Sequence, residues 1–256
     1  STLFSIVQTR NKLNNSYFTL QKSHFIPKKM ILNIETATPV CSVAIGENGQ
    51  ILAERMLKGR QTHAAKLTLL IQECLTEVGI KLQDLDAVAV SHGPGSYTGL
   101  RIGLSTAKGL CYTLDKPLIT IKTLAALANV TKMNFPTENA VYCPMIDARR
   151  MEVYTAIYDN DGNELLETQP LIVENEDFFE SYFKNNQTVI FSGDGSTKCQ
   201  SMITNPNAKF VEQENSAVGM LALAEAKCAK GIFADLAYSS PFYLKSPNIT
   251  KPKKKL

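Results

Sequence analysis

Residues 31–54 read ILNIETATPVCSVAIGENGQILAE, and residues 141–167 read VYCPMIDARRMEVYTAIYDNDGNELLE. Each stretch opens with an apolar run that ends in an acid, Glu35 or Asp147, and a second apolar run then leads to an Asn-Gly or Asp-Gly pair. The acid lies 19 residues before the last glutamate of the first stretch and 20 before that of the second. Asn-Gly and Asp-Gly favour hairpins, because type I′ turns need positive φ at both central positions. The sequence therefore predicts two antiparallel meanders of three strands each.

Helix and strand patterns follow each meander. After the first, we expect a helix at 62–79 with Thr62 as N-cap, a strand at 86–91, a helix at 98–113, a strand at 118–121 and a helix at 123–131. After the second, we expect a helix at 178–183, a strand at 188–192 and a helix at 217–229.

Three antiparallel strands followed by helix–strand units, twice in one chain, are the layout of the ribonuclease-H-like fold that is duplicated in the actin superfamily. The predicted class is therefore α/β, with two lobes that each hold a mixed sheet and flanking helices. We expect the lobes at 30–133 and 134–246. A coincidental similarity of two hairpins is the alternative.

The charge is distributed unevenly along the 256 residues. The formal net charge is +3, yet residues 1–29 hold five cations and no acid, and residues 251–256 hold four lysines. The other 18 cations and all 24 acids fall in residues 30–250, which therefore carry −6. An acidic body argues against a nucleic-acid footprint over the whole surface and leaves room for a local basic patch.

The two ends are set apart from the predicted lobes. Met30 directly precedes the first apolar run, so we interpret residues 1–29 as upstream or added sequence, with a basic transit peptide as the alternative. We expect residues 247–256 to be a solvated basic tail, whose functional alternative is a tether that attracts phosphate.

Composition indicates a soluble cytoplasmic protein. Apolar residues make up 44% of the chain and charged residues 20%, and no stretch approaches the roughly 18 to 20 apolar residues that a membrane helix needs. The six cysteines form no Cys-x-x-Cys pair, so we expect buried, reduced thiols rather than a zinc site or a disulfide framework.

A glycine-rich turn, SHGPGSYTGLRIG at residues 91–103, joins a predicted strand to a predicted helix. Gly93 and Gly95 allow a sharp turn whose backbone lies close to whatever packs on it. Ser96 or Thr98 can cap the helix, and the free N–H groups of its first turn form an anion site. The turn has neither the P-loop spacing nor Gly-x-Gly-x-x-Gly, so a tightly packed strand-to-helix connection is the competing interpretation.

The segment GPGSYTGLRIG at 93–103, with IETATPVCSV at 34–43, resembles the bacterial TsaB (YeaZ) family. Turns at 192–195 and 241–244 also fit that family, so the resemblance extends over residues 30–244. It implies the two-lobed actin-like ATPase fold and a role as partner of TsaD in forming N6-threonylcarbamoyladenosine on tRNAs that read codons beginning with A. In that pathway TsaC makes threonylcarbamoyl-adenylate, TsaD transfers the carbamoyl group, and the ATPase TsaE acts on the TsaB–TsaD pair.

A histidine-pair metal site is not expected. TsaD and the older peptidase assignment of the superfamily rest on a helix with His-x-x-x-His, which places two imidazoles on one face. Here His63 is followed four positions later by Leu67, and the other histidines are His24 and His92. We therefore expect no metal, no metallopeptidase activity and no catalytic residue, with His63 an ordinary surface or interface residue.

Nucleotide binding is left open by the sequence. Glu35 and Asp147 end the first strands of the repeats, where the actin-like superfamily carries acids that position metal and phosphate. The loop 36–39 lacks glycines, and two arginines follow Asp147 where a phosphate hairpin would be glycine-rich. A degenerate site retained for folding is favoured, and ATP or ADP in the partner complex is the candidate ligand. The candidate nucleotide residues are Glu35, Thr36, Gly93, Gly95, Ser96, Arg101, Gly193 and Gly195.

The predicted helix at 62–79 has a second use. Beyond its core stripe, Ala65 and Leu69 extend an apolar surface that a partner helix could cover. The family resemblance implies that this region serves homodimers and the competing TsaB–TsaD heterodimer. Deeper burial of the helix in its own lobe is the alternative. The candidate interface residues are His63, Ala65, Lys66, Leu69, Leu70 and Glu73.

The sequence therefore predicts a non-catalytic partner of TsaD that meets TsaE and tRNA through the complex and forms a homodimer when alone. A self-sufficient ATP-dependent phosphotransferase or ATPase of the actin-like superfamily is the main alternative. A direct RNA binder is a third, which needs a basic groove with stacking aromatics. The acidic body and the absence of tryptophan argue against it.

Overall fold

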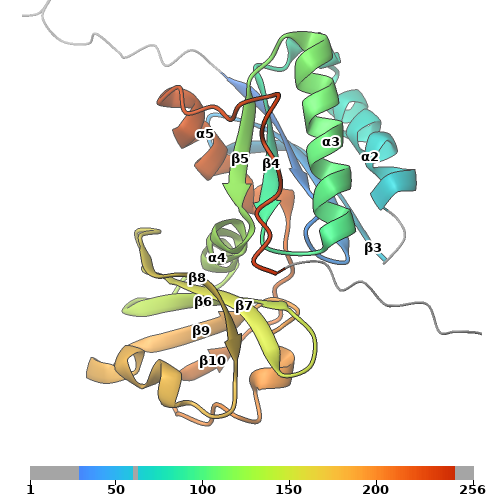
Figure 1. Ribbon diagram of the computed structural model, residues 1–256. Helices are drawn as coiled ribbons and strands as arrows, with labels where there is room; N and C mark the ends of the chain where they lie inside the picture. The colour runs from blue at the N-terminus through green and yellow to red at the C-terminus, as the bar shows by residue number, and fades with distance from the viewer. Residues whose placement is uncertain (1–28, 60–62, 246–256) are drawn as a thin grey trace, which may run out of the picture.

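The computed structural model describes residues 29–59 and 63–245, which form two lobes, each built on a five-stranded sheet (Figure 1). The predicted cap Thr62 lies outside these residues. In the first part of the chain the elements are β1 (Met30–Glu35), β2 (Val40–Glu47), β3 (Gln50–Lys58), α2 (His63–Val78), β4 (Ala87–Gly93), α3 (Tyr97–Leu114), β5 (Leu118–Lys122) and α4 (Thr123–Asn134). In the second part they are β6 (Ala140–Asp147), β7 (Glu152–Tyr158), β8 (Glu164–Ile172), β9 (Thr188–Ser192), β10 (Ala208–Phe210) and α5 (Leu221–Ala229).

The two sheets have the same topology. The strand orders are β3-β2-β1-β4-β5 and β10-β9-β6-β7-β8. In each sheet the first three strands pair antiparallel, as predicted, and the two later strands add in parallel beside the first. The repeat is thus structural, and the predicted duplicated ribonuclease-H-like class is confirmed.

The two hairpin turns differ from one another. Asn48 and Gly49 both have positive φ, and Glu47 pairs with Gln50, so the first hairpin has the predicted two-residue turn. In the second hairpin the loop runs over residues 159–163, and Asp161 has no positive φ. The prediction of a type I′ turn is wrong there, because the Asp159 carboxylate accepts the amides of Asp161 and Asn163 and holds a wider loop.

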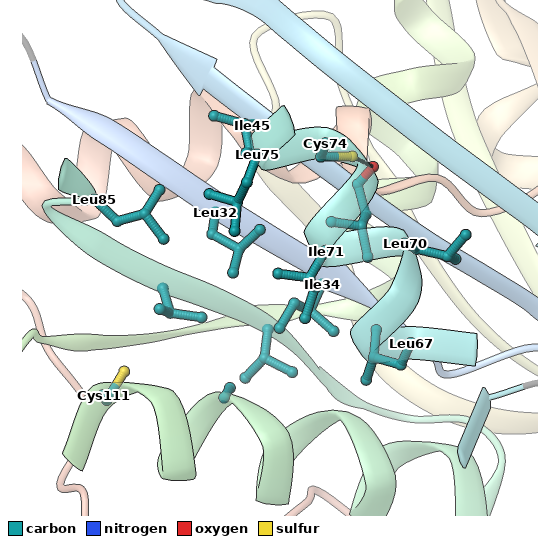
Figure 2. Close-up of a cluster of buried hydrophobic side chains, with 14 of the residues drawn as sticks. Leu32, Ile34, Ile45, Leu67, Leu70, Ile71, Cys74, Leu75, Leu85 and Cys111 are labelled. Atoms are coloured by element: carbon teal, nitrogen blue, oxygen red, sulfur yellow. Dashed lines mark hydrogen bonds between the residues drawn. The ribbon is translucent and has the colours of Figure 1, made fainter. Parts of the chain in front are cut away.

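The core of the first lobe lies between its sheet and the helices α2 and α3. Figure 2 shows the apolar side chains of α2, including Leu67, Ile71 and Cys74, against Leu32 and Ile34 of β1. These α2 residues follow the helical period, so one stripe of the helix is buried and the opposite stripe stays in solvent.

The other face of the first sheet is covered by the end of the chain. The 3₁₀ turn η5 (Ala217–Met220) and α5 place Met220, Ala224 and Cys228 against Ile31 and Ala89. The sequence assigned these helical residues to the second lobe at 134–246. The structure differs, because a sheet with one face already packed by α2 and α3 buries its second face only if another apolar helix returns to it.

Helix α4 lies between the lobes (Figure 1). Its Leu124 and Leu127 pack with the second sheet, while Ala126 packs with the first. In the second lobe, 3₁₀ turns replace longer helices. The predicted helix at 178–183 is η2 (Asp177–Tyr182), and η4 (Thr197–Cys199) follows β9 where α3 follows β4.

The six cysteines are all free and buried, as expected for structural thiols. Within residues 29–59 and 63–245, no helix has the length and apolar character needed to cross a bilayer.

Helix α3 lies very close to the β1–β2 loop. The Thr36 hydroxyl donates to Gly99 O at 2.9 Å, and a Cβ on Gly99 would lie 2.1 Å from Thr36 O. A Cβ on Gly103 would lie 2.2 Å from Thr36 Oγ1. Glycine at both positions lets the helix backbone reach the loop, as the four-residue spacing of small residues predicts.

We expect Gly99→Ala to lower the free energy of unfolding by about 1–3 kcal/mol, because the new methyl group overlaps a backbone carbonyl that cannot rotate away. Gly109→Ala, in the same helix with open space around its Cβ position, is the control and should raise stability by about 0.5–1 kcal/mol. Urea unfolding measures both. Equal changes in the free energy of unfolding for the two substitutions would show that the contact with the β1–β2 loop does not require glycine at position 99.

Candidate functional site

A cleft of about 1410 Å³ lies between the two lobes. Its walls come from the β1–β2 loop, the start of α2, the glycine-rich turn, the β6–β7 turn and a segment near the end of the described chain. The lining residues include Ala37, Pro39, Gly95, Ser96, Asp147, Arg149, Arg150, Asp194, Phe242 and Lys245.

The glycine-rich turn forms the wall of the first lobe. Ser96 caps α3, because its Oγ accepts the Gly99 amide at 3.2 Å, which settles the choice between Ser96 and Thr98. The Ser96 amide donates to Ala37 O at 2.6 Å, and a Cβ on Gly95 would lie 2.4 Å from that same oxygen. The turn is therefore pressed onto the β1–β2 loop, and the Ser96 amide is directed to protein.

The second lobe repeats this arrangement. After β9, the Gly195 amide donates to Met145 O at 3.0 Å, and a Cβ on Gly193 would lie 2.3 Å from the same carbonyl. The adjacent Asp194 Oδ1 accepts the Asp147 amide at 3.0 Å, and burial raises the pKa of Asp194 above its ordinary value. Lys198 forms an ion pair with the Asp147 carboxylate at the edge of the cleft.

The β6–β7 turn carries two arginines in an unusual conformation. Arg149 and Arg150 have φ of +74° and +52°, a region that glycine or asparagine normally occupies. The turn is held by the Arg149 amide donating to Asp147 Oδ1 at 3.0 Å and by the Ala148 amide donating to Glu152 O at 3.0 Å. Both arginines line the cleft, where a phosphate hairpin of the superfamily would be glycine-rich.

Residues 235–245, which we call the strap, run along α3 to the cleft (Figure 1). The Phe242 amide donates to His92 O at 2.8 Å, and the His92 ring nitrogen Nε2 lies 2.8 Å from Ser240 O. A Cβ on Gly93 would lie 2.3 Å from Phe242 O, so glycine is needed there to admit the strap. At its end, Lys245 forms an ion pair with Glu152 of the second lobe.

A carboxyl group lies buried at the end of β1. Glu35 Oε1 accepts the Ala37 amide at 2.7 Å, and Oε2 has no hydrogen-bond partner in the described structure. The neighbouring Asn215 Nδ2 is likewise buried and unpaired. Burial raises the pKa of Glu35 to about 7, and the bond from Ala37 opposes the rise.

The eight candidate nucleotide residues are thus only partly brought together. Gly95 and Ser96 line the cleft. Glu35 and Thr36 are buried behind the wall, and Arg101 is exposed and donates to Tyr97 Oη at 3.0 Å. Gly93, Gly193 and Gly195 serve close packing, through the strap or through β6.

The interface candidates on α2 divide in a similar way. Ala65, Lys66 and Leu69 are exposed, with Leu69 at 46%. Leu70 is part of the core instead (Figure 2), because it lies on the same stripe as Leu67. Leu70 is therefore buried within its own lobe, contrary to its prediction as an interface residue.

His63 and Glu73 have partners within their own lobe. His63 is buried, with Nε2 lying 3.0 Å from Thr38 O and 3.2 Å from Val40 O, so the expectation of a surface residue is wrong. This bond fixes the start of α2 to the β1–β2 loop. Glu73 pairs with Arg55 of β3 at 3.5 Å.

Two features of the site were missed from the sequence. The strap was seen only as a turn at 241–244, although the apolar and aromatic run PFYL at those positions is typical of a docked segment. Asn215 gave no signal, because a lone asparagine in a loop is common. Among the described residues, no group of three or more histidine, cysteine or acidic side chains is placed to hold a metal ion.

Comparisons with known proteins give a consistent family. The sequence model described as "TsaD: tRNA N6-adenosine threonylcarbamoyltransferase" matches residues 50–255. The "tRNA threonylcarbamoyladenosine biosynthesis protein TsaB" of Escherichia coli is 40% identical over 134 residues, which are 52% of this chain and 56% of that protein. Its counterpart in Bacillus subtilis is 30% identical over 174 residues, 68% of this chain and 74% of that protein.

The solved structure titled "YeaZ from Pseudomonas aeruginosa" superposes with a TM-score of 0.72 and 27% identity. The alignment covers 84% of this chain and all of that one. The chain belongs to the TsaB (YeaZ) family, within the wider group that the TsaD model describes. The match to the Escherichia coli relative spans little more than half of that protein's length.

Glu35 should make the stability of the protein depend on pH. A carboxyl whose folded pKa of about 7 exceeds its ordinary 4.5 stabilises the fold when protonated, so this contribution is complete below pH 4.5 and is lost as the pH rises to 7. Over that interval we expect a loss of about 3 kcal/mol that Glu35→Gln removes. Urea unfolding of both proteins at several pH values measures the difference, and parallel pH profiles would contradict the assignment.

Proposed function

We propose that this chain is a non-catalytic partner subunit of a TsaD-type threonylcarbamoyltransferase, required in the cytoplasm to form N6-threonylcarbamoyladenosine on tRNA. One observation carries the proposal. The chain matches the transferase family over residues 50–255, yet on α2 it has Leu67 four positions after His63, where the transferase helix carries its second histidine. His63 itself is bound to two backbone carbonyls, Thr38 O and Val40 O. A chain that keeps the scaffold without the histidine pair is suited to bind the catalytic relative.

The exposed stripe of α2 is the surface proposed to meet that relative. Ala65 and Leu69 lie in solvent on the side of the helix opposite its core stripe, with Lys66 beside them. A small residue and a leucine one turn apart leave room for a second helix to pack closely. The same surface supports a homodimer when the transferase is absent, so the two assemblies compete for it.

The cleft supports a structural role better than nucleotide turnover. The Ser96 and Gly195 amides, which a phosphate would need, donate to carbonyls of the protein itself. The expected ATP or ADP therefore belongs to the assembled complex, in which a TsaE-type ATPase acts on the pair. tRNA is the substrate of that assembly.

Depleting the chain in its native cell should lower threonylcarbamoyladenosine in digested total tRNA, because the transferase lacks its activator. Mass spectrometry of the nucleosides measures the modified base against unmodified adenosine. Re-expression of the chain is the control and should restore the level. An unchanged level after complete depletion would overturn the proposal.

We expect Leu69→Asp to weaken binding to the catalytic subunit by about tenfold or more, because the new carboxylate would be buried at the contact without a partner. Leu165→Asp is the matched control, since Leu165 is 49% exposed on β8 of the second lobe. Titration calorimetry with the purified transferase measures both affinities. Similar losses of affinity for the two variants, or no loss for Leu69→Asp, would show that the interface does not lie on α2.

A further inference from the structure

One face of the first lobe joins α3 to the strap. It begins at the cleft, which Tyr97, Phe242 and Tyr243 line, and continues along α3 away from the cleft and from the α2 contact. It is formed by Tyr97, Arg101, Lys108, Tyr112, Tyr238, Phe242 and Tyr243, and we call it the α3–strap face. We propose that the α3–strap face is a direct binding surface for single-stranded RNA, with bases stacking on its tyrosines and phosphates meeting its cations.

The strap and α3 are fixed side by side in opposite directions (Figure 1). Near the cleft, the Tyr97 and Tyr243 rings stack with centroids 4.7 Å apart. Further along, Lys108 Nζ donates to Ala237 O at 3.0 Å and to Ser239 O at 3.1 Å. Tyr112 follows Lys108 by one helical turn. These contacts place Tyr238 beside the Lys108–Tyr112 turn, so the two segments make one continuous surface about 22 Å long along α3.

The face concentrates the exposed aromatic side chains of the described structure. Among all described residues, seven phenylalanine and tyrosine side chains are exposed, and five of these seven belong to the α3–strap face. Tyr112 is 82% exposed and Tyr238 is 87% exposed, so most of each ring faces solvent. Exposed aromatic rings on a fixed backbone are the platforms on which unpaired bases stack.

The charge of the face differs from that of the rest of the body. Residues 97–114 contain no acid and the strap contains one, Asp235, whose carboxylate accepts the Ala237 and Tyr238 amides, whereas residues 30–250 as a whole carry −6. Arg101 lies over the Tyr97 ring at 5.4 Å, and Lys108 stands between the two ends of the face. The sequence beyond the strap adds four lysines and no acid in residues 246–256. A polyanion is therefore attracted to this face and repelled from the acidic remainder.

The chemistry favours RNA over a protein partner. No exposed leucine, isoleucine or methionine occurs within 97–114 or 236–245, so the described face has no aliphatic patch for a protein helix to cover. Its exposed apolar groups are aromatic, and its ionised groups are cationic. Stacking rings interleaved with arginine and lysine are the arrangement that binds a single strand without sequence preference.

The RNA-binding proposal rests on the proposed function, because tRNA is the substrate of the assembly with the transferase. It goes further, because it makes this chain itself contact the tRNA. Binding is measured on the isolated full-length chain with a fluorescein-labelled 12-nucleotide RNA of mixed sequence, by fluorescence anisotropy at 50 mM and 200 mM salt. If the chain does not bind this RNA but its depletion still lowers threonylcarbamoyladenosine in tRNA, the RNA surface is overturned and the proposed function stands.

We expect the double variant Tyr112→Ala/Tyr238→Ala to raise the Kd by about tenfold or more, since stacking is lost. The pair Tyr112→Phe/Tyr238→Phe keeps the rings and should bind like the parent. Phe178→Ala, at an exposed aromatic of the second lobe, is the matched control and should have no effect. Arg101→Gln should lower the slope of log K against log salt by about 0.7.

Three results would overturn the proposal. They are the absence of RNA binding at 50 mM salt, a Kd that the alanine pair leaves unchanged, and a loss of all affinity on cutting the chain after Lys245 while the tyrosine variants bind normally. The last result would assign the RNA to residues 246–256. If the alanine pair instead abolished binding to the transferase in calorimetry and left RNA binding unchanged, the face would be a binding surface for a protein partner.

Discussion

The close approach of the α3 backbone to Thr36 and Ala37 is the contact on which the rest of the first lobe depends. Gly95 and Gly99 leave no side chain between the helix start and the β1–β2 loop, and the Ser96 amide and the Thr36 hydroxyl close the contact with hydrogen bonds. The loop held in this way places the carbonyls that fix His63 and so sets where α2 begins. A glycine motif that could cradle a ligand is here occupied by the protein's own backbone.

The same close backbone contact occurs in the second lobe, where Gly193 and Gly195 pack directly against the backbone of β6. The two lobes nevertheless differ in the acid that ends the first strand. Glu35 is buried with one oxygen unpaired, whereas Asp147 is exposed at the cleft and paired with Lys198. Duplication has preserved the backbone geometry of the turns while the polar chemistry around them has diverged. The fold therefore identifies the ancestry of the chain more firmly than it identifies a reaction.

Much of the fold could be predicted from the sequence, because strand alternation, helical period and the Asn-Gly turn are local signals. The strands of both meanders followed from them, whereas the sequence left the cap of α3 open between Ser96 and Thr98. The placement of α5 on the first sheet did not, since the sequence shows that a stripe is apolar but not which distant surface buries it. The site was harder for the same reason. The partner of His63 is a carbonyl 25 residues earlier in the chain, which no local pattern indicates. Leu70 is buried and Leu69 exposed only because the two point in different directions around the helix.

The return of α5 and the strap to the first sheet has a consequence for the order of folding during synthesis. A chain emerging from the ribosome presents β1 to β5 early, but the face of that sheet that α4 covers only in part stays incomplete until Met220, Ala224 and Cys228 have been made. The first lobe is therefore completed only after the second lobe has been synthesised between its two parts. The lobes cannot mature one after the other as independent domains often do, and the nascent chain keeps part of an apolar sheet face uncovered while the second lobe is being synthesised.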